Sequence, residues 1–481
     1  MTTHRLSASQ HIARPVDEVF GFFAEPRNLA RLTPSSMDFA FLSDDFVMRE
    51  GLTIEYRLKP LFGVPAKWRT LIAEYDAPRR FADVQLAGPY RRWEHRHTFT
   101  PVPGGTLVED EVEYELPFGP LGALGHRWLV RGELERIFRY RARAIESIFA
   151  DAAHIASPHT VAVAGGTGFV GGAIARELFK RGHRVIVLSQ RGETARGSLP
   201  DAIGIRSADV TVGSGLAAAL AGVDTLVISL AFHNLPIEAP RRGQTFAAID
   251  GDGTERLVRA AREAGVQRIV YMSGAGAAVD APRHWFRVKW RAEQAVRSSG
   301  LGYTVIRPTW IYGPDDASLN RFIGFGRRLP MVPMTNLGGQ LLAPVFIDDI
   351  AQLAADSVVD PAADRQVFEI GGPQTMPMRE VIDHALKAAG LSRPIIPGPT
   401  PLIKLAVAPL ALLPQPPMTP SAIDFINQPA AVDVGPLLER MPRRLTPLDE
   451  GLATYLGPNA RPGELAFDAP APVHAPAEHA A

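Results

Sequence analysis

The chain has 481 residues, and its 51 lysines and arginines match its 51 aspartates and glutamates, so its formal net charge is zero. This balance gives no reason to expect a nucleic acid or another polyanion as partner. The absence of cysteine excludes disulfides, cysteine-ligated zinc and thiol catalysis, and the length is sufficient for two or three domains.

Two features bear on localisation. The N-terminal residues contain no apolar core of the kind found in a signal peptide. The longest apolar stretch, 405–413, is too short to span a bilayer and contains Pro409. We therefore expect a cytoplasmic protein without a transmembrane segment.

Residues 1–153 form the first predicted domain. A short helical pair over 15–34 is followed by runs in which apolar and polar residues alternate, and a long helix with an apolar stripe ends near residue 149. The strand-like runs are 52–59, 66–75, 81–87 and 92–101. The turn at Pro103-Gly-Gly105 predicts a hairpin, because it joins two alternating segments.

Polar residues stand on the apolar face of that hairpin. His95 and His97 share the face of Trp93 on its first strand, and Asp110 falls on the apolar side of the second strand. They are either polar groups of a ligand cavity, or residues that lie at the rim of the sheet or form local hydrogen bonds.

The helical pair, curved antiparallel sheet and C-terminal helix resemble the START-like, polyketide-cyclase-type (SRPBCC) superfamily. The resemblance rests on Pro15-Val-Asp-Glu-Val-Phe20, on Trp93-Glu-His-Arg-His-Thr-Phe99 with its hairpin, and on the terminal helix. It implies an α+β helix-grip fold whose cavity holds an apolar small molecule such as a lipid, quinone or polyketide. The residues then expected to line the cavity are His95, His97, Asp110 and Trp128. No metal site is predicted.

After a linker at 154–158, the run from Thr160 to Gly172 is the most informative stretch of the sequence. A short apolar strand leads into glycines at 165, 166, 168 and 171, an amphipathic helix follows, and a second strand covers 184–189. This order is typical of the phosphate-binding turn of a dinucleotide-binding βαβ unit, in which glycines allow the backbone to approach a pyrophosphate at a helix N-terminus.

Strands and helices alternate beyond this unit. They are expected at 225–230, 254–264, 268–272, 285–298 and 303–307. The pattern predicts an α/β, Rossmann-like domain with a doubly wound parallel sheet over 159–461. Residues 462–481 are rich in alanine and proline and are predicted to be a disordered tail.

Residues 160–370 resemble an extended short-chain dehydrogenase/reductase of the NAD-dependent epimerase/dehydratase type. The motifs that carry the resemblance are Gly165-Gly-Thr-Gly-Phe-Val-Gly171, Ala264-Gly-Val-Gln-Arg-Ile-Val-Tyr-Met-Ser273, Arg307-Pro-Thr-Trp-Ile-Tyr-Gly-Pro314 and Pro344-Val-Phe-Ile-Asp-Asp-Ile350. The glycine pattern and Leu445-Thr-Pro-Leu-Asp-Glu-Gly451 are similar to an atypical branch related to the nucleotide-binding accessory subunit of respiratory complex I.

The resemblance implies a set of cofactor-binding residues. They are Gly165, Thr167, Gly168, Phe169, Val170 and Gly171 in the phosphate loop, Asp209 and Val210 beside the adenine, and Lys289 on the ribose. At the end of the second strand Arg191 stands where an NAD-preferring relative has an acidic residue, which favours NADP(H). The nearby Glu193 leaves NAD(H) open, and Arg191 has the alternative of being a solvated loop cation.

The catalytic residues of the family are not all present. Lys289 matches the family lysine, but the tyrosine position is Trp285 and the serine position falls at Gly274 to Gly276. Indole is neither an acid nor a base near neutral pH. Asp250 replaces an asparagine usual in the family.

Three interpretations remain. The domain is an oxidoreductase or epimerase that uses another acid, with His284, Asp250, His233 and Tyr312 as candidates beside Lys289. Alternatively it binds NADP(H) without turnover, as an assembly factor, a sensor or a quinone- or lipid-handling factor. In the third, the N-terminal cavity carries an apolar molecule that the nucleotide domain modifies or regulates.

The C-terminal segments set substrate specificity in extended members of this family, here about 315–350 and beyond 372. The apolar stretch 402–413 lies among prolines, which predicts no long regular helix. We expect it to be buried against its domain, with a homodimer contact or a membrane-surface contact as alternatives.

Overall fold

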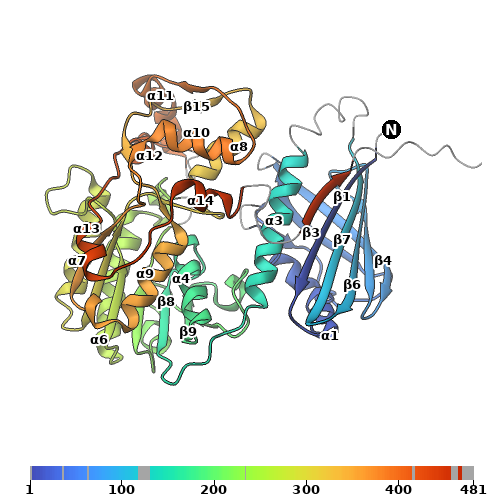
Figure 1. The fold of residues 1–481 in the computed structure, drawn as a ribbon, viewed down its shortest axis with the longest axis horizontal. Helices are drawn as coiled ribbons and strands as arrows, with labels where there is room; N and C mark the ends of the chain where they lie inside the picture. Colours follow the sequence, from blue (N-terminus) through green and yellow to red (C-terminus); the bar gives the residue numbers. More distant parts are fainter. Residues whose placement is uncertain are drawn as a thin grey trace, which may run out of the picture. The chain divides into compact units, whose positions relative to one another are not determined.

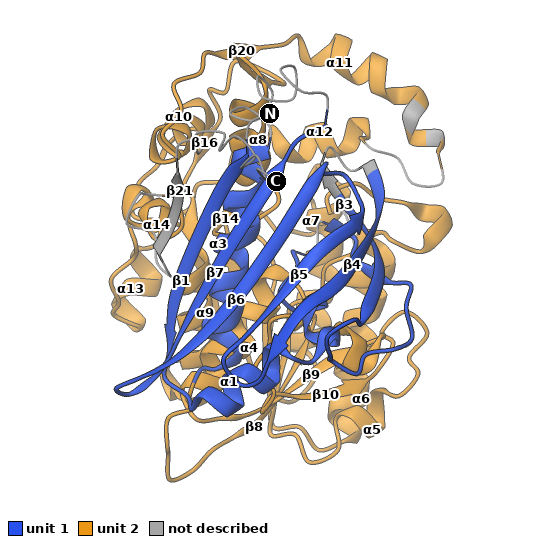
Figure 2. Ribbon diagram, turned by 90° about the vertical axis from the view of Figure 1, so that its right-hand side faces the viewer, with its two compact units in different colours: residues 1–150, 461–481 blue, residues 151–460 orange. Residues whose placement is uncertain are grey.

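The computed structural model describes residues 3–34, 37–61, 64–117, 130–232, 235–413, 418–456 and 464–468. The chain divides into two compact units, one of residues 1–150 with 461–481 and one of residues 151–460 (Figure 2). The division at 150/151 lies three residues before the predicted end of the first domain. The predicted Trp128 lies outside the described residues.

The first unit contains one curved antiparallel sheet in the order β2-β3-β4-β5-β6-β7-β1-β21. Its strands are β1 (His4–Ile12), β2 (Ala40–Phe41), β3 (Thr53–Leu61), β4 (Val64–Asp76), β5 (Arg80–Ala87), β6 (Arg92–Val102), β7 (Gly105–Glu115) and β21 (Glu464–Asp468). Its helices are α1 (Val16–Phe23), the 3₁₀ helix η1 (Pro26–Ala30) and α3 (Arg131–Ile148).

The apolar stripe of α3 packs on the inner face of this sheet (Figure 1). Leu134 and Phe138 of α3 share a buried cluster with Leu6 of β1 and Val112 of β7. Alternate residues of β6 and β7 are buried, as the alternation predicts. The helix-grip fold and the β6–β7 hairpin are therefore confirmed.

Strands β1, β2 and β21 of this unit were not predicted. In β1 only His4, Leu6 and Ile12 are buried. The residues between Leu6 and Ile12 are small or polar, so the sequence lacks the alternation of apolar and polar residues that predicts a strand. Glu464–Asp468 form β21 within the stretch predicted to be disordered from 462 onward, and pair antiparallel with β1. A strand edge offers unpaired backbone groups to such a segment, and composition does not reveal this.

The second unit is built on a seven-stranded sheet in the order β10-β9-β8-β11-β12-β13-β18, in which every pair is parallel. Its strands are β8 (Thr160–Ala164), β9 (Arg184–Ser189), β10 (Gly204–Ser207), β11 (Thr225–Ile228), β12 (Arg268–Met272), β13 (Gly302–Pro308) and β18 (Gln366–Ile370). The predicted doubly wound parallel sheet is confirmed.

Helices cover both faces of this sheet (Figure 1). They include α4 (Phe169–Lys180), α5 (Leu216–Ala219), the π-helical η6 (Phe246–Gly253), α6 (Thr254–Glu263), α7 (His284–Arg297) and α9 (Ile347–Val359). Helix α4 packs against α9, and α6 packs against α7. Side chains of β8 point alternately to the two faces of the sheet. Ala162 and Ala164 point to the face covered by α6 and α7, with which they share a buried cluster.

The C-terminal segments add short elements to this unit. The helices are α8 (Leu319–Arg328), α10 (Met378–Ala388), α11 (Thr400–Val407), α12 (Pro420–Ile426), α13 (Gly435–Arg440) and α14 (Leu448–Ala453), with 3₁₀ turns η4 (Gly192–Ala195), η5 (Pro240–Arg242), η7 (Pro361–Ala363) and η8 (Ala408–Leu412). Three two-stranded sheets pair β14 (Ile311–Tyr312) with β17 (Val345–Phe346), β15 (Val332–Met334) with β20 (Ile395–Pro397), and β16 (Leu341–Leu342) with β19 (Met376–Pro377).

Within the described ranges, every helix is too short or too polar to cross a lipid bilayer.

Candidate functional site

The turn between β8 and α4 lies where the strand order of the second unit reverses, between β8 and β11. Gly165 has φ of +83°, and a Cβ built on it would stand 2.1 Å from the carbonyl oxygen of Ser229, just beyond β11. Neither the conformation nor the space admits a side chain. In doubly wound sheets, ligands bind at such a switch point.

Gly171 and Gly168, two further glycines of the turn, differ in what surrounds them. A Cβ on Gly171 would lie 2.3 Å from the carbonyl oxygen of Gly165, so helix and turn pack too closely for a side chain. Gly168 is exposed, and its Cβ would meet only that same oxygen, at 3.3 Å. The missing side chain of Gly168 therefore leaves open space at the start of α4.

This open space suits a pyrophosphate. Gly168 is the N-cap of α4 without any side-chain cap, and the first backbone N–H groups of a helix have no partner within it. Phe169, Val170 and Gly171 would direct those groups at an anion, which the helix dipole also favours. The exposed Thr167 stands beside them.

At the end of β9, Arg191 is exposed and donates its backbone N–H to the Ser189 hydroxyl at 3.2 Å. Glu193, which could have neutralised Arg191, forms an ion pair with Arg196 at 2.8 Å instead. The Arg191 side chain has no ion-pair partner among the described residues.

The carboxylate of Asp209, just beyond β10, forms hydrogen bonds within its own turn. Its carboxylate accepts hydrogen bonds from the backbone and hydroxyl of Thr211 at 2.7 and 2.6 Å and from Gln190 at 2.7 Å. Burial works to raise the pKa of Asp209, but these donors outweigh it and the pKa lies below its usual value. Val210 follows with its carbonyl bound by Arg256, at 3.1 Å.

Lys289 and Asp250 form a buried ion pair. The Lys289 Nζ lies 2.6 Å from Asp250 Oδ1, donates to the Met272 carbonyl at 3.1 Å and stands over the Tyr271 ring. Burial works to lower the pKa of Lys289, yet Asp250 outweighs it and that pKa is raised; burial also raises the pKa of Asp250. The pair joins η6 to α7 just below the carboxyl end of β12.

Trp285, at the position of the family's tyrosine, and Ser273, just before the position of its serine, both have structural partners. Trp285 is 3% exposed, packs among Phe232, Phe246 and Phe425, and donates its indole N–H to Gln428 at 3.2 Å. Ser273, directly after β12, is buried and donates to Glu293 at 2.5 Å. The indole fills core, and the hydroxyl belongs to a structural network.

Two other candidate acids lie in different surroundings. His284 is 42% exposed at the start of α7, and its Nε2 lies 2.9 Å from Glu238 Oε2. Tyr312 is fully buried and its hydroxyl reaches the carbonyl of Leu448 at 3.3 Å, which fixes α14 to β14. This position does not suit exchange of protons with a bound molecule. His233 lies outside the described residues.

In the first unit, His95, His97 and Asp110 come together in the core. His95 Nε2 and His97 Nδ1 lie 3.1 and 2.5 Å from Asp110 Oδ1. The three side chains are buried and hydrogen-bonded to one another. Two further members, Asp83 on β5 and Arg141 on α3, were not predicted.

The sequence carried signals for both. Asp83 is the direct register partner of His95, and it shares a face with the buried Phe81. Arg141 has the spacing of the apolar stripe of α3, between Phe138 and Ile145, and is 9% exposed. Burial works against the charge of Asp110, but Arg141 and the imidazoles outweigh it and keep its pKa well below the usual range. Burial lowers the pKa of His95 to about 4.

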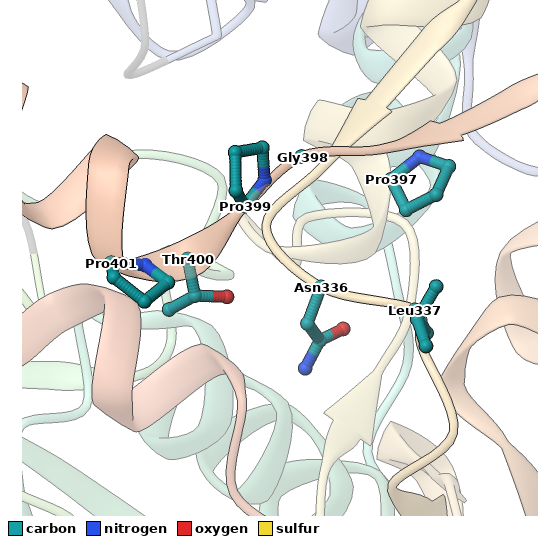
Figure 3. Close-up of a pocket in the computed structure, with 7 residues that line it drawn as sticks. All are labelled: Asn336, Leu337, Pro397, Gly398, Pro399, Thr400 and Pro401. Carbon is teal, nitrogen blue, oxygen red and sulfur yellow. The ribbon is translucent and has the colours of Figure 1, made fainter.

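The C-terminal segments contain a hollow of about 350 Å³ between the loop after β15 and the end of β20 (Figure 3). Its lining residues are Asn336, Leu337, Pro397, Gly398, Pro399, Thr400 and Pro401. These segments are among those predicted to set substrate specificity.

The adjoining helix α11 ends at Val407, so the absence of a long regular helix is confirmed. The expected burial of 402–413 is wrong: Leu402, Leu405 and Leu413 are 63%, 72% and 49% exposed.

Comparison with known families agrees with this division. Residues 3–146 match the family described as polyketide cyclase / dehydrase and lipid transport. Residues 165–330 match the family described as NAD(P)H-binding.

Curated relatives match the second unit. NADH dehydrogenase (ubiquinone) 1 alpha subcomplex subunit 9, mitochondrial, of Arabidopsis thaliana is 26% identical over 46% of this chain and 56% of its own length. The mouse protein of that name is 32% identical over 30% of this chain and 38% of its own length. The 2-alkyl-3-oxoalkanoate reductase of Stenotrophomonas maltophilia is 27% identical over 48% and 76%. The chain thus spans about half, or less, of the first two relatives.

Solved structures share the fold of this unit. The UDP-glucose 4-epimerase of Thermotoga maritima, with UDP-glucose, is 17% identical, with 62% of this chain and 97% of that chain covered and a TM-score of 0.50. A mutant UDP-glucuronic acid 4-epimerase of Bacillus cereus, in complex with UDP-4-deoxy-4-fluoro-glucuronic acid and NAD, is 15% identical over 62% and 98%, also at 0.50.

Proposed function

Because the chain joins a polyketide-cyclase-type (SRPBCC) domain to an NAD(P)-binding, epimerase/dehydratase-like short-chain dehydrogenase/reductase domain, we propose that it binds NADP(H) together with an apolar small molecule. The nucleotide occupies the turn between β8 and α4. Gly168 and the N–H groups of Phe169, Val170 and Gly171 hold the pyrophosphate, and Lys289 holds the ribose.

The preference for NADP(H) rests on Arg191. Its guanidinium is exposed at the end of β9, and the nearby Glu193 is engaged by Arg196. A guanidinium binds a phosphate with paired hydrogen bonds, whereas the ribose hydroxyl of NAD(H) is better matched by a carboxylate. Arg191 therefore stabilises the bound 2′-phosphate of NADP(H) more than the 2′-hydroxyl of NAD(H).

The residues near the expected nucleotide site favour binding of the nucleotide without the proton transfer that the family's tyrosine performs. NADPH supplies a hydride when bound, but Trp285 is closed into an apolar cluster and Ser273 is bound to Glu293. Lys289 is paired with Asp250, and its raised pKa keeps it protonated near neutral pH, so it does not act as a base there. We therefore infer a binding, sensing or quinone- or lipid-handling role.

A reductase or isomerase is the second candidate, favoured by His284. This partly exposed imidazole precedes Trp285, and its Nε2 lies 2.9 Å from Glu238 Oε2, which orients the ring. An apolar carbonyl compound is the substrate class that a 2-alkyl-3-oxoalkanoate reductase among the relatives suggests. His284→Gln abolishes turnover under this candidate and leaves NADPH binding unchanged.

The apolar ligand is assigned to the N-terminal domain, whose family includes lipid transport. The exposed leucines of 402–413 are a surface for a second copy of the chain or for a membrane. Mass spectrometry of molecules that co-purify with the chain identifies the ligand; a chain that repeatedly carries none would contradict this assignment.

Arg191→Ala tests the nucleotide preference, with Arg184→Ala as its control. Arg184 is also exposed but stands at the amino end of β9, away from the turn. We expect Arg191→Ala to weaken NADPH binding by about tenfold, or about 1.4 kcal/mol, with little change for NADH. Equal loss for both nucleotides, or the same loss in Arg184→Ala, would refute the role of Arg191.

A further inference from the structure

The buried polar cluster of the first unit has a geometry that hydrogen bonding alone does not explain. Asp83 Oδ2 lies 3.8 Å from His95 Nδ1 and 3.7 Å from His97 Nε2. Both distances exceed those of a hydrogen bond. The three residues nevertheless converge, since one possible metal-ligating atom of each lies within 4.8 Å of those of the other two.

Strand pairing creates this convergence. Asp83 on β5 faces His95 on β6 in register, and His97 on β6 faces Asp110 on β7. Residues two apart on β6 point to the same side of the sheet, so both imidazoles stand between the two carboxyl groups. Their rings are 3.9 Å apart, with Phe81 and Phe138 beside them.

Each imidazole uses its two nitrogens for different partners. One nitrogen of each ring bonds Asp110, at 3.1 Å from His95 and 2.5 Å from His97, and the other points to Asp83. Histidines that bind metals characteristically donate their second N–H to a carboxylate, which fixes the ring orientation. Arg141 Nη2 donates to Asp110 Oδ1 at 3.4 Å and also lies 3.3 Å from His97 Nδ1, so it holds the carboxylate and the ring nitrogen bound to it.

The distances are close to those of a metal site. Ligand atoms at 2.0–2.2 Å from a tetrahedral Zn²⁺ are about 3.4 Å apart. The separations of Asp83 Oδ2 from the two imidazole nitrogens, 3.8 and 3.7 Å, exceed this spacing by a few tenths of an ångström. A cation there also offsets the charge of the cluster, which has two carboxyl groups against the single guanidinium of Arg141.

We propose that His95 Nδ1, His97 Nε2 and Asp83 Oδ2 bind a divalent first-row transition-metal ion of the Zn²⁺ type, and that Asp110 is the carboxylate that orients the two imidazoles. Two imidazoles and one carboxylate favour such an ion over Mg²⁺ or Ca²⁺, which prefer oxygen ligands alone. Three protein ligands leave a coordination position for water or for a polar atom of the apolar ligand.

The test uses the full chain, stripped with a chelator and titrated with Zn²⁺ by calorimetry, with Co²⁺ absorption as a spectroscopic readout of coordination. We expect one Zn²⁺ per chain and no saturable heat from Mg²⁺. Asp83→Asn, which keeps the shape of a partly exposed side chain, should weaken Zn²⁺ binding at least tenfold. Asp110→Asn should weaken it by about 10–100-fold.

His11→Ala is the matched control, because His11 is an exposed histidine of β1 in the same unit. It should bind Zn²⁺ like the wild type, and circular dichroism should show that all variants are folded. Absence of stoichiometric Zn²⁺ and Co²⁺ binding by the wild-type chain would overturn the proposal. So would Zn²⁺ binding that survives Asp83→Asn but is lost in His11→Ala.

Discussion

Gly168→Asp separates the stability of the fold from its capacity to bind a nucleotide. A Cβ at Gly168 meets only the Gly165 carbonyl oxygen, at 3.3 Å, and its φ of −88° is open to any residue. Aspartate is also a favoured N-cap, and α4 has no side-chain cap. The unliganded variant should therefore be as stable as the wild type, or more stable by up to about 1 kcal/mol.

The same carboxylate stands where the pyrophosphate would bind. Two unit charges about 4 Å apart repel by about 4 kcal/mol at an effective dielectric constant of 20. Because each 1.4 kcal/mol is a factor of ten, NADPH binding should weaken by roughly 10³-fold.

Fluorescence titration with NADPH measures this loss, and thermal unfolding without nucleotide measures stability. Gly168→Asn, which caps the helix without a charge, should lose clearly less affinity than Gly168→Asp. A Gly168→Asp chain that is folded and binds NADPH within threefold of the wild type would refute the placement of the pyrophosphate.

Three further changes test other parts of the structure. Gly165→Ala forces a Cβ against the Ser229 carbonyl at positive φ; it should lower the free energy of unfolding by about 3 kcal/mol or more in urea titrations, and a loss under 1 kcal/mol would contradict the tight turn. Lys289→Met leaves the buried Asp250 unpaired and should cost about 3–5 kcal/mol at pH 7.5. That cost should shrink as the pH is lowered from 7.5, because Asp250, whose pKa burial already raises, takes up a proton; a pH-independent cost would argue against the ion pair. Burial lowers the pKa of His183 below its ordinary 6.5, so its contribution to stability is complete above pH 6.5 and is lost as the pH falls through the folded-state value; His183→Asn should flatten the fall of the melting temperature between pH 7 and 5, and an unchanged profile would assign that fall to other groups.

The Rossmann-like unit could be read from the sequence because its signals are local. Gly165 and Gly171 are required by a single turn, and the periodicity of β12 and α7 follows from burial on one or two faces. The short strand β21 has no such local signal, because it forms by pairing with β1, which lies at the other end of the chain.

The sites could be predicted only in part, because long-range partners decide what a side chain does. Tyr312 was a candidate acid until its contact with Leu448 showed a structural role. Asp83 and Arg141 were missed, although one pairs with His95 across two strands and the other lies on the apolar face of α3. A buried arginine at core spacing and an acidic strand residue beside Phe81 are signals of a polar cluster.

Equilibrium titration of the purified full chain with NADPH and with NADH tests the central claim most directly. We expect one NADPH per chain, bound more tightly than NADH, since the turn after β8 binds the pyrophosphate of both and Arg191 favours the 2′-phosphate. Binding of neither nucleotide at millimolar concentration, by a folded chain, would contradict the account.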